Sequence, residues 1–290
     1  MKITRVEPEI TTIHGMDHTP IRLAMFHAEQ AIGVIQIVHG FGEGIEYYDE
    51  IGSYFAKQGY TVVLHDQRGF GKMPDIEKRM KRKARGVIEN YEWFLNDIES
   101  VALYIEERFV HVPKFLYGFS MGGNISVNFL LKRRHWQDRY QKYVMVAPWI
   151  ENYKNANKYL KWVAKQMGGL SPHIKIRSYL NIMRISHDYK RIFDLRDDGV
   201  FHDVISLRMF AQVQEAGEYA ITHAEELTLP TFLMIAQDDR IVCNQAIRRF
   251  LYHTNKNVRY KEYAKAYHCL HFEREREDIL ADVVKFFQTV

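Results

Sequence analysis

Short apolar runs alternate with stretches of helical periodicity along most of the chain. The apolar runs predict strands at residues 21–27, 33–38, 61–64, 113–117 and 143–147. Apolar side chains recur with helical spacing between them, at 48–58, 93–109 and 121–132. The alternation returns later, with strands at 231–236 and 258–263 and helices at 244–253 and 273–288. Such a pattern predicts an α/β fold, with a mostly parallel central sheet and helices on both faces.

The middle of the chain has a different pattern. Residues 149–229 contain several helical patterns and no convincing strand. We therefore predict one core domain formed by residues 1–148 and 230–290, interrupted by a helical insertion at 149–229.

The strongest local motif lies where the predicted strand 113–117 passes into the predicted helix 121–132. It reads Gly118-Phe119-Ser120-Met121-Gly122. Gly-x-Ser-x-Gly in this context is typical of a nucleophile elbow, a turn so sharp that the residues flanking the serine must be small. The alternative is an ordinary glycine-rich turn with a serine that caps the helix. The strand and the helix on either side favour the elbow.

A nucleophilic serine needs a base and an orienting acid, which follow it in the order Asp and then His. Asp238 and Asp239 follow the predicted strand 231–236, and His268 and His271 follow the strand 258–263. Carboxyl ends of parallel strands meet at one sheet edge, so these groups are expected near Ser120. Taken singly, such an Asp is more often a turn residue and such a His a surface residue.

A glycine-rich loop follows the strand 33–38 and reads His39-Gly40-Phe41-Gly42. Its glycines allow the backbone to approach a ligand closely, so we predict that His39, Gly40 and Gly42 contribute to substrate binding. The backbone N–H groups of Phe41 and Met121 are the expected donors to an oxyanion. The alternative is an ordinary loop between a strand and a helix.

These motifs, together with His65-Asp66-Gln67-Arg68-Gly69, Gln237-Asp238-Asp239-Arg240 and Asp197-Asp198-Gly199, resemble the α/β-hydrolase fold and, within it, the monoacylglycerol lipase/lysophospholipase group. The resemblance runs from about Gly33 to the C-terminus. It implies a catalytic triad of Ser120, Asp239 and His268, preferring Asp239 over Asp238 and His268 over His271. It also implies that residues 149–229, called the cap segment below, form a lid.

The resemblance implies a serine carboxylester hydrolase that cleaves monoacylglycerol-like or lysophospholipid-like esters through an acyl-enzyme on Ser120, with neither a metal nor an organic cofactor. Thioester hydrolysis and acyl transfer on the same fold are alternatives. A non-catalytic binding protein is another, although a binder does not need all three polar triad residues.

The composition indicates the class of protein, its partners and the compartment in which we expect it. Hydrophobic residues make up 47% and charged residues 26%, as in a globular protein. The net charge of +4 gives no argument for a nucleic-acid partner. The two cysteines, Cys243 and Cys269, are read as packing thiols in a reducing compartment. Without a signal peptide or an apolar run of about 20 residues, the chain is predicted to be cytoplasmic.

Two basic features suggest contact with a membrane surface. Residues 78–85 contain six basic side chains, and Lys154, Lys158, Lys161 and Lys165 form one stripe of a predicted helix. A solvated loop and a cap helix packed over the site are the simpler interpretations. Attraction to an anionic lipid surface is the alternative.

Overall fold

The computed structural model describes residues 5–289 except 73–82, 154–157, 179 and 198. Its center is an eight-stranded sheet of order β1-β2-β4-β3-β5-β6-β9-β10. β1 and β4 both run antiparallel to β2, and the other neighbours are parallel, which confirms the predicted mostly parallel sheet. The strands are β1 (Glu9–His14), β2 (Pro20–Phe26), β3 (Gly33–Val38), β4 (Tyr60–His65), β5 (Lys114–Phe119), β6 (Lys142–Val146), β9 (Thr231–Ala236) and β10 (Val258–Tyr263).

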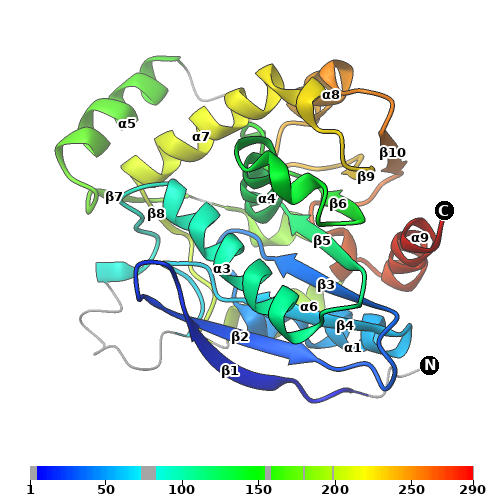
Figure 1. Ribbon diagram of the computed structural model, residues 1–290. Coiled ribbons are helices and arrows are strands. Elements are labelled where there is room, and N and C mark those ends of the chain that lie inside the picture. Colours follow the sequence, from blue (N-terminus) through cyan, green and yellow to red (C-terminus); the bar gives the residue numbers. More distant parts are fainter. Residues whose placement is uncertain (1–4, 73–82, 154–157, 179, 198, 290) are drawn as a thin grey trace.

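Helices cover both faces of this sheet (Figure 1). α1 (Asp49–Lys57) and α9 (Arg276–Gln288) pack on one face, and α3 (Glu92–Arg108), α4 (Met121–Lys132) and α8 (Asn244–His253) pack on the other. Successive strand residues serve opposite faces: Leu116 of β5 packs with α3 and α4, whereas Tyr117 packs with α1 and α9. The central strands β3, β4 and β9 are buried along their whole length, which explains their continuous apolar sequences.

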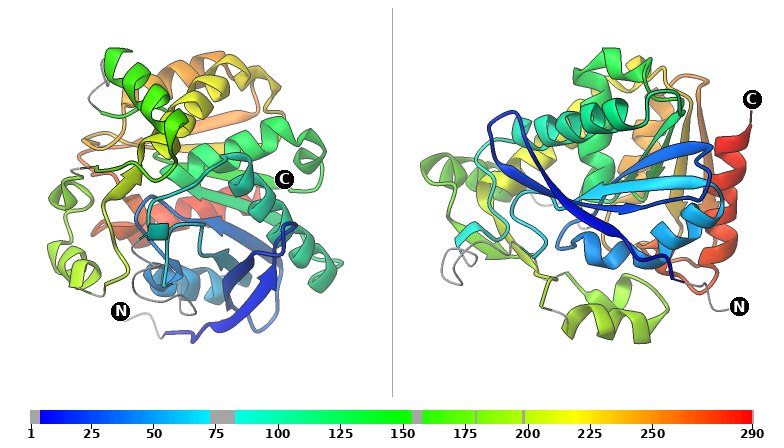
Figure 2. Two further views of the ribbon diagram at one scale, coloured as in Figure 1. Left: turned by 90° about the vertical axis from the view of Figure 1, so that its left-hand side faces the viewer. Right: turned by 60° about the horizontal axis from the view of Figure 1, so that its bottom comes forward.

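In sequence, the cap segment follows β6 and precedes β9, and Figure 2 shows its helices in green to yellow. It contains α5 (Lys158–Leu170), β7 (Lys175–Arg177), α6 (Tyr189–Asp197), β8 (Val204–Ser206) and α7 (Leu207–Thr222). β7 and β8 form a separate antiparallel pair, so the expectation of a segment without strands is wrong. Three residues are too few to produce a readable alternation. That the cap segment forms a separate lid stays a prediction.

Two further differences concern the ends of the chain. β1 was not predicted, because its apolar residues Ile10 and Ile13 are three positions apart and do not alternate as in a strand. The last helix begins at Arg276 rather than at residue 273, because a short 3₁₀ turn at Leu270–Phe272 precedes it. Most of the basic run 78–85, and Lys154, lie outside the described residues. No helix in the described part of the chain is long and apolar enough to span a bilayer.

Candidate active site

Ser120 occupies the junction between β5 and α4 in a strained backbone conformation, with φ 53° and ψ −116°. The flanking glycines make this turn sterically possible. A Cβ atom on Gly122 would lie 2.0 Å from the carbonyl oxygen of Val38, and one on Gly118 would lie 2.7 Å from the hydroxyl of Ser126. The turn therefore requires glycine at both positions, and it sets Ser120 at the carboxyl edge of the sheet.

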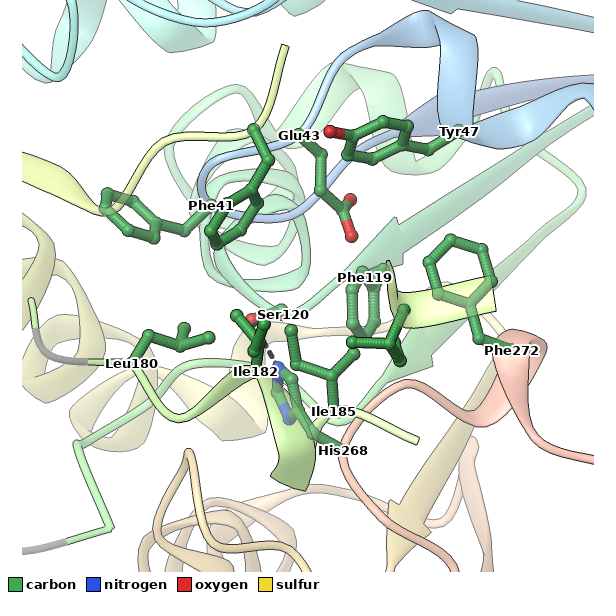
Figure 3. A pocket seen from close by; sticks show the side chains of 12 residues that line it. Phe41, Glu43, Tyr47, Phe119, Ser120, Leu180, Ile182, Ile185, His268 and Phe272 are labelled. Carbon is green, nitrogen blue, oxygen red and sulfur yellow. Dashed lines mark hydrogen bonds between the residues drawn. The ribbon is translucent and has the colours of Figure 1, made fainter. Parts of the chain in front are cut away.

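The structure brings Ser120, His268 and Asp239 together (Figure 3 shows the first two). His268 Nε2 lies 2.8 Å from Ser120 Oγ, and His268 Nδ1 lies 2.7 Å from Asp239 Oδ2. The carboxylate can only accept, so Nδ1 carries the proton and Nε2 is free to accept from the serine hydroxyl. Asp239 Oδ1 accepts the N–H groups of Ile241 at 2.7 Å and Val242 at 3.0 Å, which fixes the orientation of the carboxylate.

The alternative acid and base lie elsewhere. The Asp238 side chain is 52% exposed, and its nearest cation is Arg240 at 3.6 Å. The ring of His271 is buried, with Nδ1 3.1 Å from the hydroxyl of Tyr117 and Nε2 3.2 Å from Cys269 Sγ. Neither side chain is placed to exchange a proton with Ser120. The close approach of Cys269 to a histidine was not expected; both cysteines are free and buried.

The predicted oxyanion donors come from two segments that pack tightly. Phe41 follows β3, and Met121 is the first residue of α4, so its N–H has no acceptor within the helix. The helix N-terminus also favours negative charge. Gly122 packs directly against the carbonyl groups of Val38 and His39, which brings the Phe41 loop beside the start of α4. This arrangement is compatible with an oxyanion hole.

His39, Gly40 and Gly42 are not among the residues that line the cavity beside Ser120, and their role in substrate binding stays a prediction. The His39 ring is buried. Its Nε2 accepts the N–H of Gln67 at 3.0 Å, and its Nδ1 lies 2.8 Å from the carbonyl of Gly40. Burial lowers the pKa of His39 to about 4, so the ring is neutral. Gly42 has φ +80°, a conformation that favours glycine. These residues order the loop.

A cavity opens beside Ser120, and its concave, mostly apolar wall is typical of small-molecule sites. Its wall combines the core with the cap segment and is mostly apolar (Figure 3). The lining residues are Phe41, Glu43, Tyr47, Phe119, Ser120, Leu180, Ile182, Ile185, Ile192, Phe201, His268 and Phe272.

Glu43 is a pocket residue to which the sequence motifs gave no role. Its carboxyl group points into the cavity (Figure 3). Oε2 accepts the N–H of Gly40 at 2.8 Å and the hydroxyl of Tyr48 at 2.9 Å. Burial raises the pKa of Glu43 to about 7. The sequence signal that could have identified Glu43 as a site residue is its position directly after the glycine-rich loop.

The described residues contain no cluster of three or more His, Cys, Asp or Glu side chains that is suited to a metal ion. The groups beside Ser120 are a base, a carboxylate and backbone N–H donors. This set supports proton transfer and stabilisation of an anion without a further group.

Comparisons with known proteins place this geometry in a family. Residues 29–275 match the model of the serine aminopeptidase S33 family. An uncharacterized abhydrolase domain-containing protein of Dictyostelium discoideum is 27% identical over 260 residues, which cover 89% of this chain and 26% of that protein. The chain thus spans about a quarter of that relative. The phospholipase YtpA of Bacillus subtilis is 26% identical over 87% of this chain and 93% of its own length.

Among solved structures, a soluble variant of monoglyceride lipase from Saccharomyces cerevisiae, in complex with a substrate analogue, matches with a TM-score of 0.86. The match covers 99% of this chain and 97% of that chain at 21% sequence identity, and it shows a common fold. The chain therefore belongs to the serine aminopeptidase S33 family, a family of serine hydrolases with the α/β-hydrolase fold.

Proposed function

We propose that the protein is a lipolytic hydrolase that cleaves monoacylglycerol-like or lysophospholipid-like carboxylic esters through an acyl-enzyme on Ser120. The hydrogen-bonded series Ser120–His268–Asp239 beside a mostly apolar cavity is the observation that carries this proposal. The names of similar proteins, a phospholipase and a putative monoglyceride lipase, point to the same substrate class.

The mechanism follows from the placement of the protons. His268 Nε2 takes the proton of Ser120 as Oγ attacks the ester carbonyl, and Asp239 stabilises the imidazolium that forms. The N–H groups of Phe41 and Met121 stabilise the tetrahedral oxyanion. His268 then donates its proton to the leaving alcohol, which leaves the acyl group on Ser120. His268 then takes a proton from a water molecule as the water attacks the acyl carbonyl. The bond from the carbonyl carbon to Ser120 Oγ breaks, His268 returns the proton to Oγ, and the fatty acid is released.

The walls of the cavity support a lipid substrate. Leu180, Ile182, Ile185, Ile192 and Phe201 of the cap segment close the cavity opposite the core. Burial of an acyl chain against such side chains stabilises it by about 0.8 kcal/mol per CH₂ group. This apolar wall supports an ester substrate that carries an acyl chain.

The decisive test is covalent labelling with a fluorophosphonate probe, followed by a panel of esters. We expect the probe to label the wild-type protein and Ser171→Ala, a control remote from the elbow, but not Ser120→Ala. Monoacylglycerol and lysophospholipid should be cleaved faster than di- and triacylglycerol. Absence of labelling in the folded wild-type protein would favour a non-catalytic binding protein. An acylated alcohol as the main product would favour acyl transfer, and preferential cleavage of a thioester would favour thioester hydrolysis.

We further propose that the cap segment contacts membrane surfaces from which such substrates are drawn. Large exposed apolar side chains concentrate on it, including Trp162, Leu170 and Phe193, which are 57%, 84% and 47% exposed. Apolar exposure of this kind favours interfacial binding. Sedimentation with phosphatidylcholine vesicles, with and without phosphatidylserine, tests this directly. Leu170→Ser should weaken binding, whereas Tyr252→Ser, a substitution of an equally exposed residue in α8, should not; equal binding by both variants would contradict the proposal.

A further inference from the structure

His268 lies on a loop between β10 and the 3₁₀ turn at Leu270–Phe272, outside regular secondary structure. The backbone of this loop is bent, with Lys265 at φ 61°. Proton transfer to and from Ser120 requires the imidazole to stay within a fraction of an ångström of its productive position. Contacts beyond the loop itself must therefore supply this order.

The carboxylate of Glu273 makes one of these contacts. Its side chain is buried and accepts hydrogen bonds from the histidine loop and from the cap segment. Oε1 accepts the N–H of Tyr267, the residue before His268, at 2.6 Å. Oε2 accepts the N–H of His187 in the cap segment at 3.1 Å, and His187 Nδ1 lies 3.1 Å from both carboxylate oxygens. One side chain thus joins the histidine loop to the cap segment.

Further contacts join the same two segments around His268. The N–H of Cys269 donates to the carbonyl of Ile185 at 2.7 Å. The ring of Tyr267 stacks on that of His187 with a centroid distance of 3.7 Å, and Arg184 donates to the hydroxyl of Tyr267 at 2.8 Å. The residues on both sides of His268 are therefore attached to residues 184–187.

Residues 184–187 also contribute to the cavity. The side chain of Ile185 lines it together with His268 (Figure 3), whereas Glu273 is absent from the wall. Glu273 therefore cannot touch a substrate in the cavity, and it can act on the reaction only through the residues that it holds.

We propose that Glu273 is a positioning residue that couples the cap segment to the imidazole of His268. The proposal rests on the role of His268 as the base in the function proposed above. The carboxylate fixes the Tyr267 amide and the His187 backbone at the same time, so the cavity wall and the base are held in one arrangement. Displacement of residues 184–187 would then loosen His268.

The test is Glu273→Gln, with Glu275→Gln, an exposed glutamate two residues later, as the matched control. An amide offers one oxygen where the carboxylate offers two, so one of the two backbone N–H groups loses its acceptor. We expect kcat to fall about 10- to 100-fold, the range for loss of catalytic alignment, with little change in KM. The control should keep wild-type kcat. His187→Ala, which removes only the imidazole contacts, should give a smaller loss.

Two measurements separate positioning from folding. Circular dichroism gives the folded fraction used to normalise kcat, and proton nuclear magnetic resonance reports the Nδ1–H of His268 against Asp239. We expect this signal to broaden in Glu273→Gln. Wild-type kcat and an unchanged signal, or a kcat loss that matches the unfolded fraction alone, would overturn the proposal.

The probe and the Nδ1–H signal test the two proposals separately. If the fluorophosphonate probe does not label the wild-type protein, the proposed hydrolase function is wrong. The Nδ1–H signal of His268 still shows whether Glu273 orders this ring. If Glu273→Gln does not fold, Glu273→Asp replaces it; this variant keeps the charge and loses reach, and the same two outcomes apply.

Discussion

Replacement of Asp239 by Asn tests the predicted acid most sharply, because the structure fixes how the amide must sit. Asp239 Oδ1 accepts two backbone N–H groups, those of Ile241 and Val242. An amide NH₂ group facing two donors would be repelled, so the amide oxygen of Asn must take the Oδ1 position. The NH₂ group then faces His268 Nδ1, where Oδ2 lies now.

This orientation reverses the tautomer of His268. Facing a donor, Nδ1 must become the acceptor, and the ring proton moves to Nε2. Nε2 can then no longer accept the proton of Ser120. Loss of the correct tautomer costs about 10⁴-fold in kcat in a serine protease triad, which corresponds to about 5.4 kcal/mol of activation free energy.

The assay is hydrolysis of a short-chain p-nitrophenyl ester, with Asp238→Asn as the matched control. Asp238 is half exposed and touches neither Ser120 nor His268, so its replacement should change kcat less than about twofold. The predicted ratio between the two variants is therefore several thousand. Equal losses in the two variants, or a large loss confined to Asp238→Asn, would refute the reasoning about the tautomer.

Three further substitutions test the elbow and the cavity. Gly122→Ala would place a methyl carbon 2.0 Å from the carbonyl oxygen of Val38, so it should destabilise the fold by about 3 kcal/mol in urea unfolding. The control Gly169→Ala should not destabilise the fold, because no atom lies within 4 Å of the added Cβ. Ser120→Gly should abolish turnover. It should also raise the free energy of unfolding by about 1 kcal/mol, because glycine tolerates φ 53°. An equal rise in the free energy of unfolding of Ser120→Ala would rule out backbone strain as the cause. The pKa of Glu43 is raised from 4.5 to about 7 in the folded protein. Between pH 4.5 and pH 7 the folded state therefore binds more protons than the unfolded state. The free energy of unfolding should fall by about 3 kcal/mol as the pH rises through this range. Glu43→Gln should remove this fall when urea midpoints at pH 5 and pH 8 are compared, and a fall that persists would assign it to another group.

The central part of the fold was readable from local pattern. The bounds of β3, α4, β9, α8 and β10 agree with the predicted runs. β3 and β9 are nearly continuous apolar runs, and α4 and α8 carry apolar residues at helical spacing. β1 was missed because its apolar residues Ile10 and Ile13 are three positions apart and do not alternate as in a strand. The pair β7–β8 was missed because strands of three residues carry too little periodicity. The start of α9 was misplaced because the backbone of Glu273, after the 3₁₀ turn at Leu270–Phe272, is extended and not helical.

The chemical groups of the site were readable for a related reason. Ser120, Asp239 and His268 each follow a strand of one parallel sheet, so the order of strands and helices already places them at one edge. For His39, the glycine-rich motif identifies the loop but does not show which way the ring points, and its predicted binding role stays a prediction. Its buried contact with Gln67 is a tertiary feature.

The cavity wall required the structure, because its cap residues have no motif in common. Leu180, Ile182 and Ile185 are ordinary aliphatic residues whose position depends on how an irregular segment packs over the sheet. The carboxylate that ties this segment to the histidine loop lies 86 residues from its partner His187. Since Ile185 lines the cavity and its carbonyl binds the Cys269 N–H, a change that reshapes this wall also acts on the loop of the base. Under the proposed function, substitutions within 184–187 that are made to alter substrate choice are therefore expected to alter proton transfer as well.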